Sequence, residues 1–355
     1  MKSMKTVMLG KTGLTVSRVG IGGIPILRPP LEEAVKILQL ALDLGFNFFD
    51  TAVGYGTKER ASGVFGSEER IGKAISGRRN HVVVATKTTA RDRVSALDHL
   101  SLSMKRLNTD YVDLWQFHNI STFAEYERVL GPGGALEAAQ EMLEANKVHH
   151  IGLSTHSMDI AIKAITSGRF ESIQYPFNFI NNEAAETLVP LAREHDVGFI
   201  AMKPFAGGRL RDAQLALKYL LQFDNVVPDP GVKKVEEVEQ IAGIVNGSWD
   251  LTSEDHQRMK KIRDEIGTKF CHWCEYCMPC PQNVNIPVLM NAHTIGNYAM
   301  SSDSEIIEAM ETAKKCVKCG TCEEKCPFHL PIREQIAANI RFLESMRNGE
   351  NGQMK

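Results

Sequence analysis

Residues 81–88 read HVVVATKT, four apolar residues in a row followed by threonine and lysine. Strands that are apolar at consecutive rather than alternate positions are typical of parallel sheets covered on both faces. Comparable runs recur along the first 230 residues of the chain. We therefore expect strands at residues 18–21, 46–52, 81–87, 111–118, 148–154, 172–178, 198–205 and 226–228.

Amphipathic helical patterns lie between these runs. Apolar residues recur with the 3.6-residue period over residues 31–42, 97–107 and 235–245. Eight strand–helix units within about 250 residues predict an α/β fold of the (β/α)8 TIM-barrel type, with a doubly wound open sheet as the rival. The glycine-containing stretch at residues 7–15 predicts a hairpin before the first barrel strand.

The composition excludes several classes of protein. Of the 355 residues, 43% are hydrophobic and 24% are charged, which is typical of a globular protein and not of a disordered one. The formal charge of −2 gives no general attraction to nucleic acid or to an anionic membrane. No run of 18 apolar residues and no secretory signal is visible. We expect a cytoplasmic protein with no nucleic-acid or membrane partner.

All eight cysteines fall between Cys271 and Cys326. Cysteines crowded at such short spacings in a reducing compartment indicate metal or cluster ligation rather than disulfides. This change in composition predicts a domain border near residue 270. We expect a barrel at residues 1–250, a connecting helix at 251–269, a cysteine domain at 270–346 and a flexible tail at 347–355.

The cysteines form two runs, each ending in Cys-Pro. The second run, Cys316-x2-Cys319-x2-Cys322-x3-Cys326-Pro327, has the bacterial ferredoxin spacing, in which the fourth cysteine ligates the other cluster. The first run, Cys271-x2-Cys274-x2-Cys277-x2-Cys280-Pro281, is one residue shorter before its last cysteine. We expect two [4Fe–4S] clusters, one held by Cys271, Cys274, Cys277 and Cys326, the other by Cys316, Cys319, Cys322 and Cys280. Two zinc sites of four thiolates each are the alternative.

Polar residues follow three consecutive strands of the predicted barrel, where TIM barrels carry their active sites. They are Asp50 and Tyr55, Lys87, and His118. An ammonium beside a phenol lowers the pKa of the phenol, and a carboxylate keeps the lysine charged. A histidine beside them donates a hydrogen bond to a substrate carbonyl. This set is suited to protonating an oxygen while hydride arrives at carbon.

Five motifs of the barrel region resemble the aldo-keto reductase family: FDTAVGYG at 49–56, GSEERIGKA at 66–74, ATK at 85–87, DLWQFH at 113–118 and IGLS at 151–154. The resemblance implies NAD(P)H-dependent reduction of a small-molecule carbonyl, or oxidation of an alcohol. It implies Tyr55 as the general acid/base, tuned by Lys87 and Asp50, and His118 as the residue that orients the carbonyl. With its cysteine segment, the whole chain resembles the subgroup that carries a C-terminal dicluster ferredoxin-like domain.

The same resemblance implies NADP(H) as cofactor, with NAD(H) as the alternative. The implied contacts are Ser154, Thr155, Gln174, Lys203, Gly231, Lys233 and Lys234. Thr155 and Met202 replace an asparagine and a tyrosine that many members have, and Glu237 replaces an arginine that helps to hold the 2′-phosphate. A carboxylate at that position repels phosphate, so we expect weak discrimination between the two cofactors.

Three functional hypotheses follow. In the first, the barrel transfers hydride while the clusters exchange single electrons with a ferredoxin-like redox partner. In the second, the enzyme is the same but the clusters are purely structural. In the third, the chain is a redox-sensing or partner-binding protein without turnover. The intact set of Asp50, Tyr55, Lys87 and His118 favours an enzyme.

Overall fold

The computed structural model describes residues 4–56, 63–267, 270–271, 277–291, 303–326 and 328–347. Its contacts divide the chain into two units, each with its own apolar core. The first unit is Met1–Phe205 with Asp212–Met259, and the second is Ala206–Arg211 with Lys260–Lys355. Residues 57–62, Cys274 and the predicted tail beyond Arg347 lie outside the described residues.

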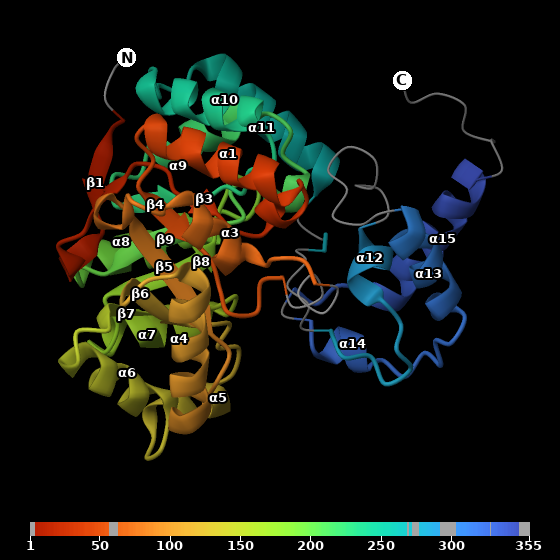
Figure 1. Ribbon diagram of the computed structural model, residues 1–355. Coiled ribbons are helices and arrows are strands. Elements are labelled where there is room, and N and C mark those ends of the chain that lie inside the picture. Colours follow the sequence, from red (N-terminus) through yellow and green to blue (C-terminus); the bar gives the residue numbers. More distant parts are fainter. Residues whose placement is uncertain are drawn as a thin grey trace. The chain divides into compact units, whose positions relative to one another are not determined.

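The first unit is built on a sheet of eight strands in which every neighbouring pair is parallel (Figure 1). The strands neighbour one another in chain order. They are β3 (Ile21–Gly22), β4 (Phe48–Asp50), β5 (Val83–Thr88), β6 (Val112–Phe117), β7 (Val148–Ser154), β8 (Ser172–Pro176), β9 (Gly198–Met202) and β10 (Val226–Pro228). Each overlaps one predicted strand, and the predicted (β/α)8 fold is confirmed.

The first and last strands close the sheet into a barrel. Gly20 N donates to Pro228 O at 2.8 Å and Gly22 N donates to Pro230 O at 2.9 Å, and Gly22 also forms a parallel bridge with Gly231. Proline has no N–H, so Pro228 and Pro230 accept these hydrogen bonds and donate none in return. β3 covers Ile21–Gly22 and overlaps the predicted strand at residues 18–21 at Ile21.

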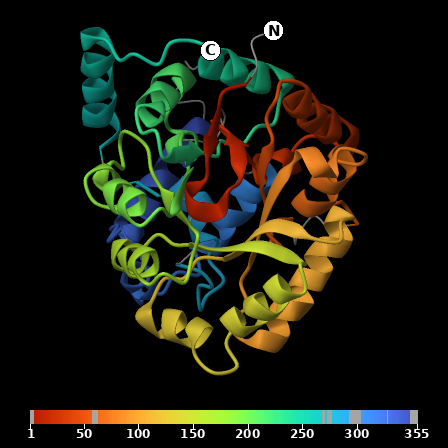
Figure 2. The ribbon, with the colours of Figure 1, turned by 90° about the vertical axis from the view of Figure 1, so that its left-hand side faces the viewer.

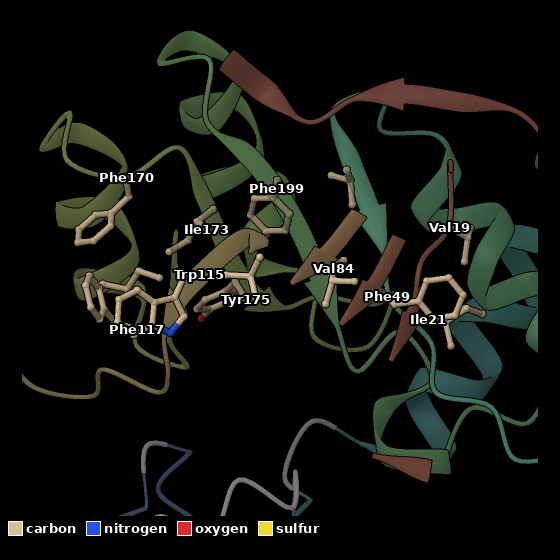
Figure 3. Close-up of a cluster of buried hydrophobic side chains, with 14 of the residues drawn as sticks. Val19, Ile21, Phe49, Val84, Trp115, Phe117, Phe170, Ile173, Tyr175 and Phe199 are labelled. Carbon is tan, nitrogen blue, oxygen red and sulfur yellow. The ribbon is translucent and has the colours of Figure 1, made fainter. Parts of the chain in front are cut away.

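Helices of the first unit pack against the outside of the barrel. They are α1 (Leu31–Asp43), α3 (Ser67–Ala74), α4 (Arg93–Leu107), α5 (Phe123–Leu130), α6 (Ala135–Glu144), α7 (Met158–Thr166), α8 (Leu188–Glu194), α9 (Ala213–Leu221) and α10 (Val235–Asn246). The helical periods predicted at 31–42, 97–107 and 235–245 correspond to α1, α4 and α10. Short 3₁₀ turns lie at Gly10–Thr12, Pro25–Leu27, Arg79–His81 and Glu183–Ala185. Strand residues such as Phe49, Val84 and Trp115 form the main core with the helices (Figure 3).

A hairpin covers the amino-terminal end of the barrel. β1 (Thr6–Met8) pairs antiparallel with β2 (Thr15–Ser17), as predicted, and lies in front of the barrel strands in Figure 2. Leu9 and Val16 of this region join a separate buried cluster with interior side chains such as Phe48, Val83 and Leu114. This end of the lumen is therefore filled with apolar side chains, and polar groups are left to the other end.

The second unit is helical in its described part. α11 (Ser253–Ile266) spans the division between the units and lies within the segment for which a connecting helix is predicted. It is followed by α12 (Ile286–Met290), α13 (Asp303–Ala313), α14 (Thr321–Glu324) and α15 (Ile332–Arg347), and a 3₁₀ turn lies at Ala206–Gly208. Ile332, Ile336 and Leu343 on one face of α15 are buried in its core. No helix in the described part of the chain is long and apolar enough to cross a membrane.

Candidate functional site

The polar residues of the barrel lumen follow the alternation of the strands. On four strands, an apolar interior residue is followed two positions later by a polar one that lies on the same face. These pairs are Phe48 and Asp50, Ala85 and Lys87, Leu114 and Gln116, and Val227 and Asp229. A buried polar layer therefore lies above the apolar layer, at the carboxyl ends of the strands.

Lys87 and Asp50 form an ion pair inside this layer. Lys87 Nζ lies 2.6 Å from Asp50 Oδ2, and their side chains are 1% and 4% exposed. Lys87 Nζ also donates to the carbonyl oxygen of Thr51 at 2.7 Å. Burial alone would lower the pKa of Lys87, but Asp50, with smaller contributions from Tyr55 and Asp229, raises it on balance. The lysine is therefore held as a cation in the barrel interior.

The Tyr55 phenol lies beside this ammonium. Lys87 Nζ is 5.0 Å from the centroid of the Tyr55 ring, and the two side chains are hydrogen-bonded. Burial raises the pKa of Tyr55 to about 12, because it and the nearby carboxyl groups outweigh the lowering by Lys87. The predicted lowering by the lysine is present, but burial, whose depth the sequence does not show, outweighs it. The phenol is therefore protonated at neutral pH and holds a proton that it can donate, with the Lys87 ammonium beside it to stabilise the phenolate.

His118 completes the group. Its ring centroid lies 5.7 Å from that of Tyr55, with the planes at 79°. Burial, together with the charges of Lys87, Arg91 and Lys203, lowers the pKa of His118 to about 3. The imidazole is therefore neutral, and within the described part of the chain its buried Nδ1 has no hydrogen-bond partner. The structure thus brings together Asp50, Tyr55, Lys87 and His118 from three consecutive strands.

The first three residues expected to bind the cofactor lie at β7 and β8: Ser154 ends β7, Thr155 follows it, and Gln174 lies within β8. Ser154 Oγ accepts from Asn119 N at 2.9 Å, and Gln174 Nε2 donates to Asp229 Oδ2 at 2.7 Å. The Thr155 hydroxyl donates to Ile120 O at 2.6 Å and accepts from the backbone N–H of Ser157 at 2.9 Å. The hydroxyl hydrogen of Thr155 is thus used in a hydrogen bond to the backbone oxygen of Ile120. Many members of the family that the sequence resembles have an asparagine amide at this position.

Lys203 lies beside the imidazole of His156. Lys203 Nζ is 3.0 Å from His156 Nε2, and His156 Nδ1 is 3.1 Å from Asn119 Oδ1. Lys203 itself has a positive φ of 56°, which is uncommon for a side chain other than glycine, asparagine or aspartate. His156 carries no motif of its own, so its contact with a predicted cofactor residue is visible only in the structure.

The predicted phosphate-binding residues lie at the start of α10. A Cβ atom on Gly231 would lie 2.3 Å from Pro25, so only glycine fits this approach of the chain. The carboxylate of Glu237 accepts a hydrogen bond from Lys233 N at 2.7 Å, and therefore caps the helix entrance as well as adding negative charge. Burial and the charge of Arg28 lower the pKa of Lys233. Arg28, from the loop after β3, is thus a third cation near this site that sequence reasoning missed.

The described cysteines of the second unit gather around one pocket and the adjoining apolar core. Cys277, Cys280, Cys316, Cys319 and Cys322 line the pocket. The side chain of Cys326 is buried in the core, against which Cys271, Cys277, Cys280 and Cys322 also pack. Among the described residues, no group of three or more His, Cys, Asp or Glu side chains is placed to hold one metal ion. A pocket lined by five cysteines is chemically suited to an iron–sulfur cluster held by thiolates.

Comparisons with known proteins match both units. The sequence profile of the Aldo/keto reductase family matches residues 18–215, and that of the 4Fe-4S dicluster domain matches residues 270–331. Aldo-keto reductase YhdN of Bacillus subtilis is 27% identical over 297 residues, which cover 76% of this chain and 84% of that protein. L-galactose dehydrogenase of Arabidopsis thaliana is 31% identical over 224 residues, 58% of this chain and 66% of that protein.

Solved structures show the same barrel. The holo form of aldo-keto reductase AKR11C1 from Bacillus halodurans superposes with a TM-score of 0.61 at 24% identity, covering 73% of this chain and 96% of that one. An aldo/keto reductase from Klebsiella pneumoniae, in complex with NADP and acetate, superposes with a TM-score of 0.62 at 23% identity, covering 73% of this chain and 95% of that one.

Proposed function

Because this chain belongs to the aldo/keto reductase family of oxidoreductases and carries a 4Fe-4S dicluster domain, we propose that it reduces the carbonyl group of a small molecule, or oxidises the corresponding alcohol, with NAD(P)H at Tyr55. The observation that carries this proposal is the buried contact of Lys87 with both Asp50 and Tyr55 at the carboxyl end of the barrel. The Tyr55 and His118 rings, which lie 5.7 Å apart beside this ion pair, complete a donor set that can act on a carbonyl oxygen.

Each side chain has one task in this reaction. When a reduced nicotinamide is bound, it would supply the hydride for the carbonyl carbon. The Tyr55 hydroxyl gives its proton to the carbonyl oxygen, and the Lys87 ammonium stabilises the phenolate that remains. Asp50 keeps Lys87 charged and in place, and the neutral His118 donates a hydrogen bond that orients the carbonyl. In the reverse direction the phenolate accepts the proton of the alcohol.

Anaerobic assays of NADPH oxidation with aldehydes and ketones of increasing size test this function. We expect turnover with a subset of these compounds, because the buried acid acts on any carbonyl that enters the lumen. Tight binding of the nicotinamide without turnover of any of them, in either direction, would instead favour the redox-sensing or partner-binding hypothesis.

The basic residues near α10 support binding of NADP(H) with weak discrimination. Lys234 is exposed, and contacts between exposed charges contribute about 1 kcal/mol each or less. We expect NADPH to bind more tightly than NADH by about tenfold or less, because Glu237 partly offsets the charges of Lys233, Lys234 and Arg28. The measurement is a pair of anaerobic titrations with NADPH and NADH. A wild-type preference above about a hundredfold would show that the phosphate site lies elsewhere.

Two variants locate the site. Arg28→Gln should reduce the preference for NADPH by roughly fivefold or less, because it removes one cation beside Lys233. Glu237→Arg should raise the preference, because a guanidinium holds a phosphate through two hydrogen bonds. Glu237→Gln is the matched control, since its amide oxygen can still accept from Lys233 N while its negative charge is removed. Arg28→Gln without effect on the ratio would exclude Arg28 from the site.

We further propose that the second unit holds two [4Fe–4S] clusters. Cys271, Cys274, Cys277 and Cys326 would hold one, and Cys280, Cys316, Cys319 and Cys322 the other. The pocket shared by Cys280, Cys316, Cys319 and Cys322 supports the second set. Cys277 also lines this pocket, so the division of the cysteines between the two clusters rests on the ferredoxin spacing of the sequence. Such clusters transfer one electron at a time. The exposed positions of Cys316 and Cys319 support exchange with a ferredoxin-like partner over a purely structural role.

Anaerobically purified protein should be brown and should contain about eight iron and eight sulfide per chain, the content of two cubanes. The measurement is metal analysis together with determination of acid-labile sulfide. Reduction with dithionite should then produce the electron paramagnetic resonance signals of reduced clusters. About two zinc per chain without labile sulfide would instead identify thiolate zinc sites.

A further inference from the structure

The barrel lumen contains a second carboxyl group, Asp229, for which the reaction above has no task. Asp229 follows β10 and is 6% exposed. Its Oδ2 accepts from Gln174 Nε2 at 2.7 Å. Within the described ranges its other oxygen, Oδ1, is buried and has no hydrogen-bond partner. A buried carboxyl group with one oxygen that makes no hydrogen bond is costly, and therefore needs a physical reason for its presence.

The charges around Asp229 do not favour its ionised form. Lys87 is the cation that acts on it, and Lys87 already makes direct contact with Asp50 at 2.6 Å. The other ionisable groups that interact with Asp229 are the Asp50 carboxylate and the Tyr55 phenol, and the neighbouring strands β3 and β9 carry no ionisable side chain. Burial, and next the charge of Asp50, raise the pKa of Asp229 well above its usual range. A second carboxylate would leave an unbalanced negative charge in a dry interior.

Asp229 ends a row of polar side chains that crosses the lumen from the catalytic ion pair. Gln116 Nε2 lies 3.4 Å from Asp50 Oδ1 and 3.5 Å from Gln174 Oε1. Gln174 then donates to Asp229, and all four side chains are buried. The amide of Gln174 is therefore held with its nitrogen towards Asp229, which leaves its oxygen as an acceptor.

We propose that Asp229 is a positioning residue that remains a neutral carboxylic acid and fixes the Gln174 amide to receive the carboxamide of the nicotinamide. Oδ2 is the carbonyl oxygen that accepts from Gln174, and Oδ1 carries the hydrogen. With the Gln174 amide in this orientation, its Oε1 can accept a hydrogen bond from the carboxamide N–H group of the nicotinamide. This inference rests on the proposed function, because it assigns Gln174 to the nicotinamide.

Two variants of Asp229 test whether the protonated form of its side chain supports cofactor binding. Asp229→Asn has the shape and the charge of the protonated acid, so NADPH should bind within about threefold of wild type. Asp229→Leu has a similar volume but offers no acceptor, so the dissociation constant for NADPH should rise by about tenfold. Both are measured by anaerobic fluorescence titration, with thermal unfolding to confirm that each variant is folded. Rescue by Asn and not by Leu is the expected result, and equal affinity of the two variants would overturn the inference.

The effect of Asp229 should pass through Gln174. Gln174→Leu should weaken NADPH binding about as much as Asp229→Leu, and the double variant should be no weaker than either single one. Losses that add in the double variant would show that Asp229 acts independently of Gln174. The comparison uses binding rather than turnover, so it separates positioning of the cofactor from the chemical step.

The protonation state has its own readout. The folded-state pKa of Asp229 lies above its unfolded value of about 3.9, so the folded protein binds the extra proton between these two values. As pH rises from about 4 towards the folded pKa, wild type should therefore lose stability relative to Asp229→Asn, by up to about tenfold in the unfolding constant per pH unit. Urea unfolding of both proteins at several pH values measures this ratio, and a ratio that does not change with pH would refute the neutral acid.

The outcomes distinguish failure of this inference from failure of the proposed function. If wild type binds neither NADPH nor NADH, the proposed function fails, while the pH dependence of unfolding still reports the state of Asp229. If wild type binds NADPH and Asp229→Leu binds it equally well, the function stands and the positioning role is wrong.

Discussion

Replacing Tyr55 with phenylalanine should lower the turnover number for carbonyl reduction by about 10²–10⁴-fold, the usual contribution of a general acid. The dissociation constant for NADPH should stay within about twofold of wild type, because the lost hydroxyl acts on the substrate oxygen and not on the cofactor. The phenol is the protonated group in contact with Lys87, and no other hydroxyl hydrogen in the described lumen has that contact. Single-turnover rates with a responsive aldehyde measure the effect.

The matched control is Tyr126→Phe. Tyr126 lies in α5, and its buried hydroxyl has no hydrogen-bond partner in the described part of the chain. Removing this hydroxyl takes the same atom from a buried tyrosine without touching the lumen, so activity and stability should be nearly unchanged. Wild-type turnover in Tyr55→Phe would mean that another group donates the proton and that the proposed chemistry is wrong.

Replacing Lys87 with methionine should have the largest effect on stability. The change leaves Asp50 without its cation in the barrel interior, and breaking a buried ion pair in this way costs about 3–5 kcal/mol of unfolding free energy. Carbonyl reduction should fall at least as far as in Tyr55→Phe, because the developing phenolate loses its counter-charge.

A double variant separates the two effects. Asp50→Asn together with Lys87→Met removes both charges, so denaturant unfolding should show that most of the lost stability returns, while activity stays low. Full recovery of turnover in the double variant would show that Lys87 is only a structural partner of Asp50. A stability of Lys87→Met equal to that of wild type would contradict the buried ion pair itself.

The order of the strands and the face that carries the site follow from local sequence patterns. Consecutive apolar residues in 82–85 require burial on both faces, and the period of two then places Asp50 and Lys87 in the lumen with Phe48 and Ala85. The period of two, applied to Val227, also places Asp229 in the lumen beside Asp50 and Lys87. Asp229 is absent from the predicted site because residues 226–228 form a short run that ends among prolines and carries no recognisable motif.

The sequence by itself determined the barrel, the polar residues at its strand ends and the spacing of the cysteines, because each depends on periodicity or on residues close together in the chain. Only the tertiary structure decided the ionisation of Tyr55, the contribution of Arg28 and the partnership of Gln174 with Asp229. A pKa is the balance of burial against charges from separate strands. That balance changes over a few ångström, and such distances are fixed only when the barrel closes.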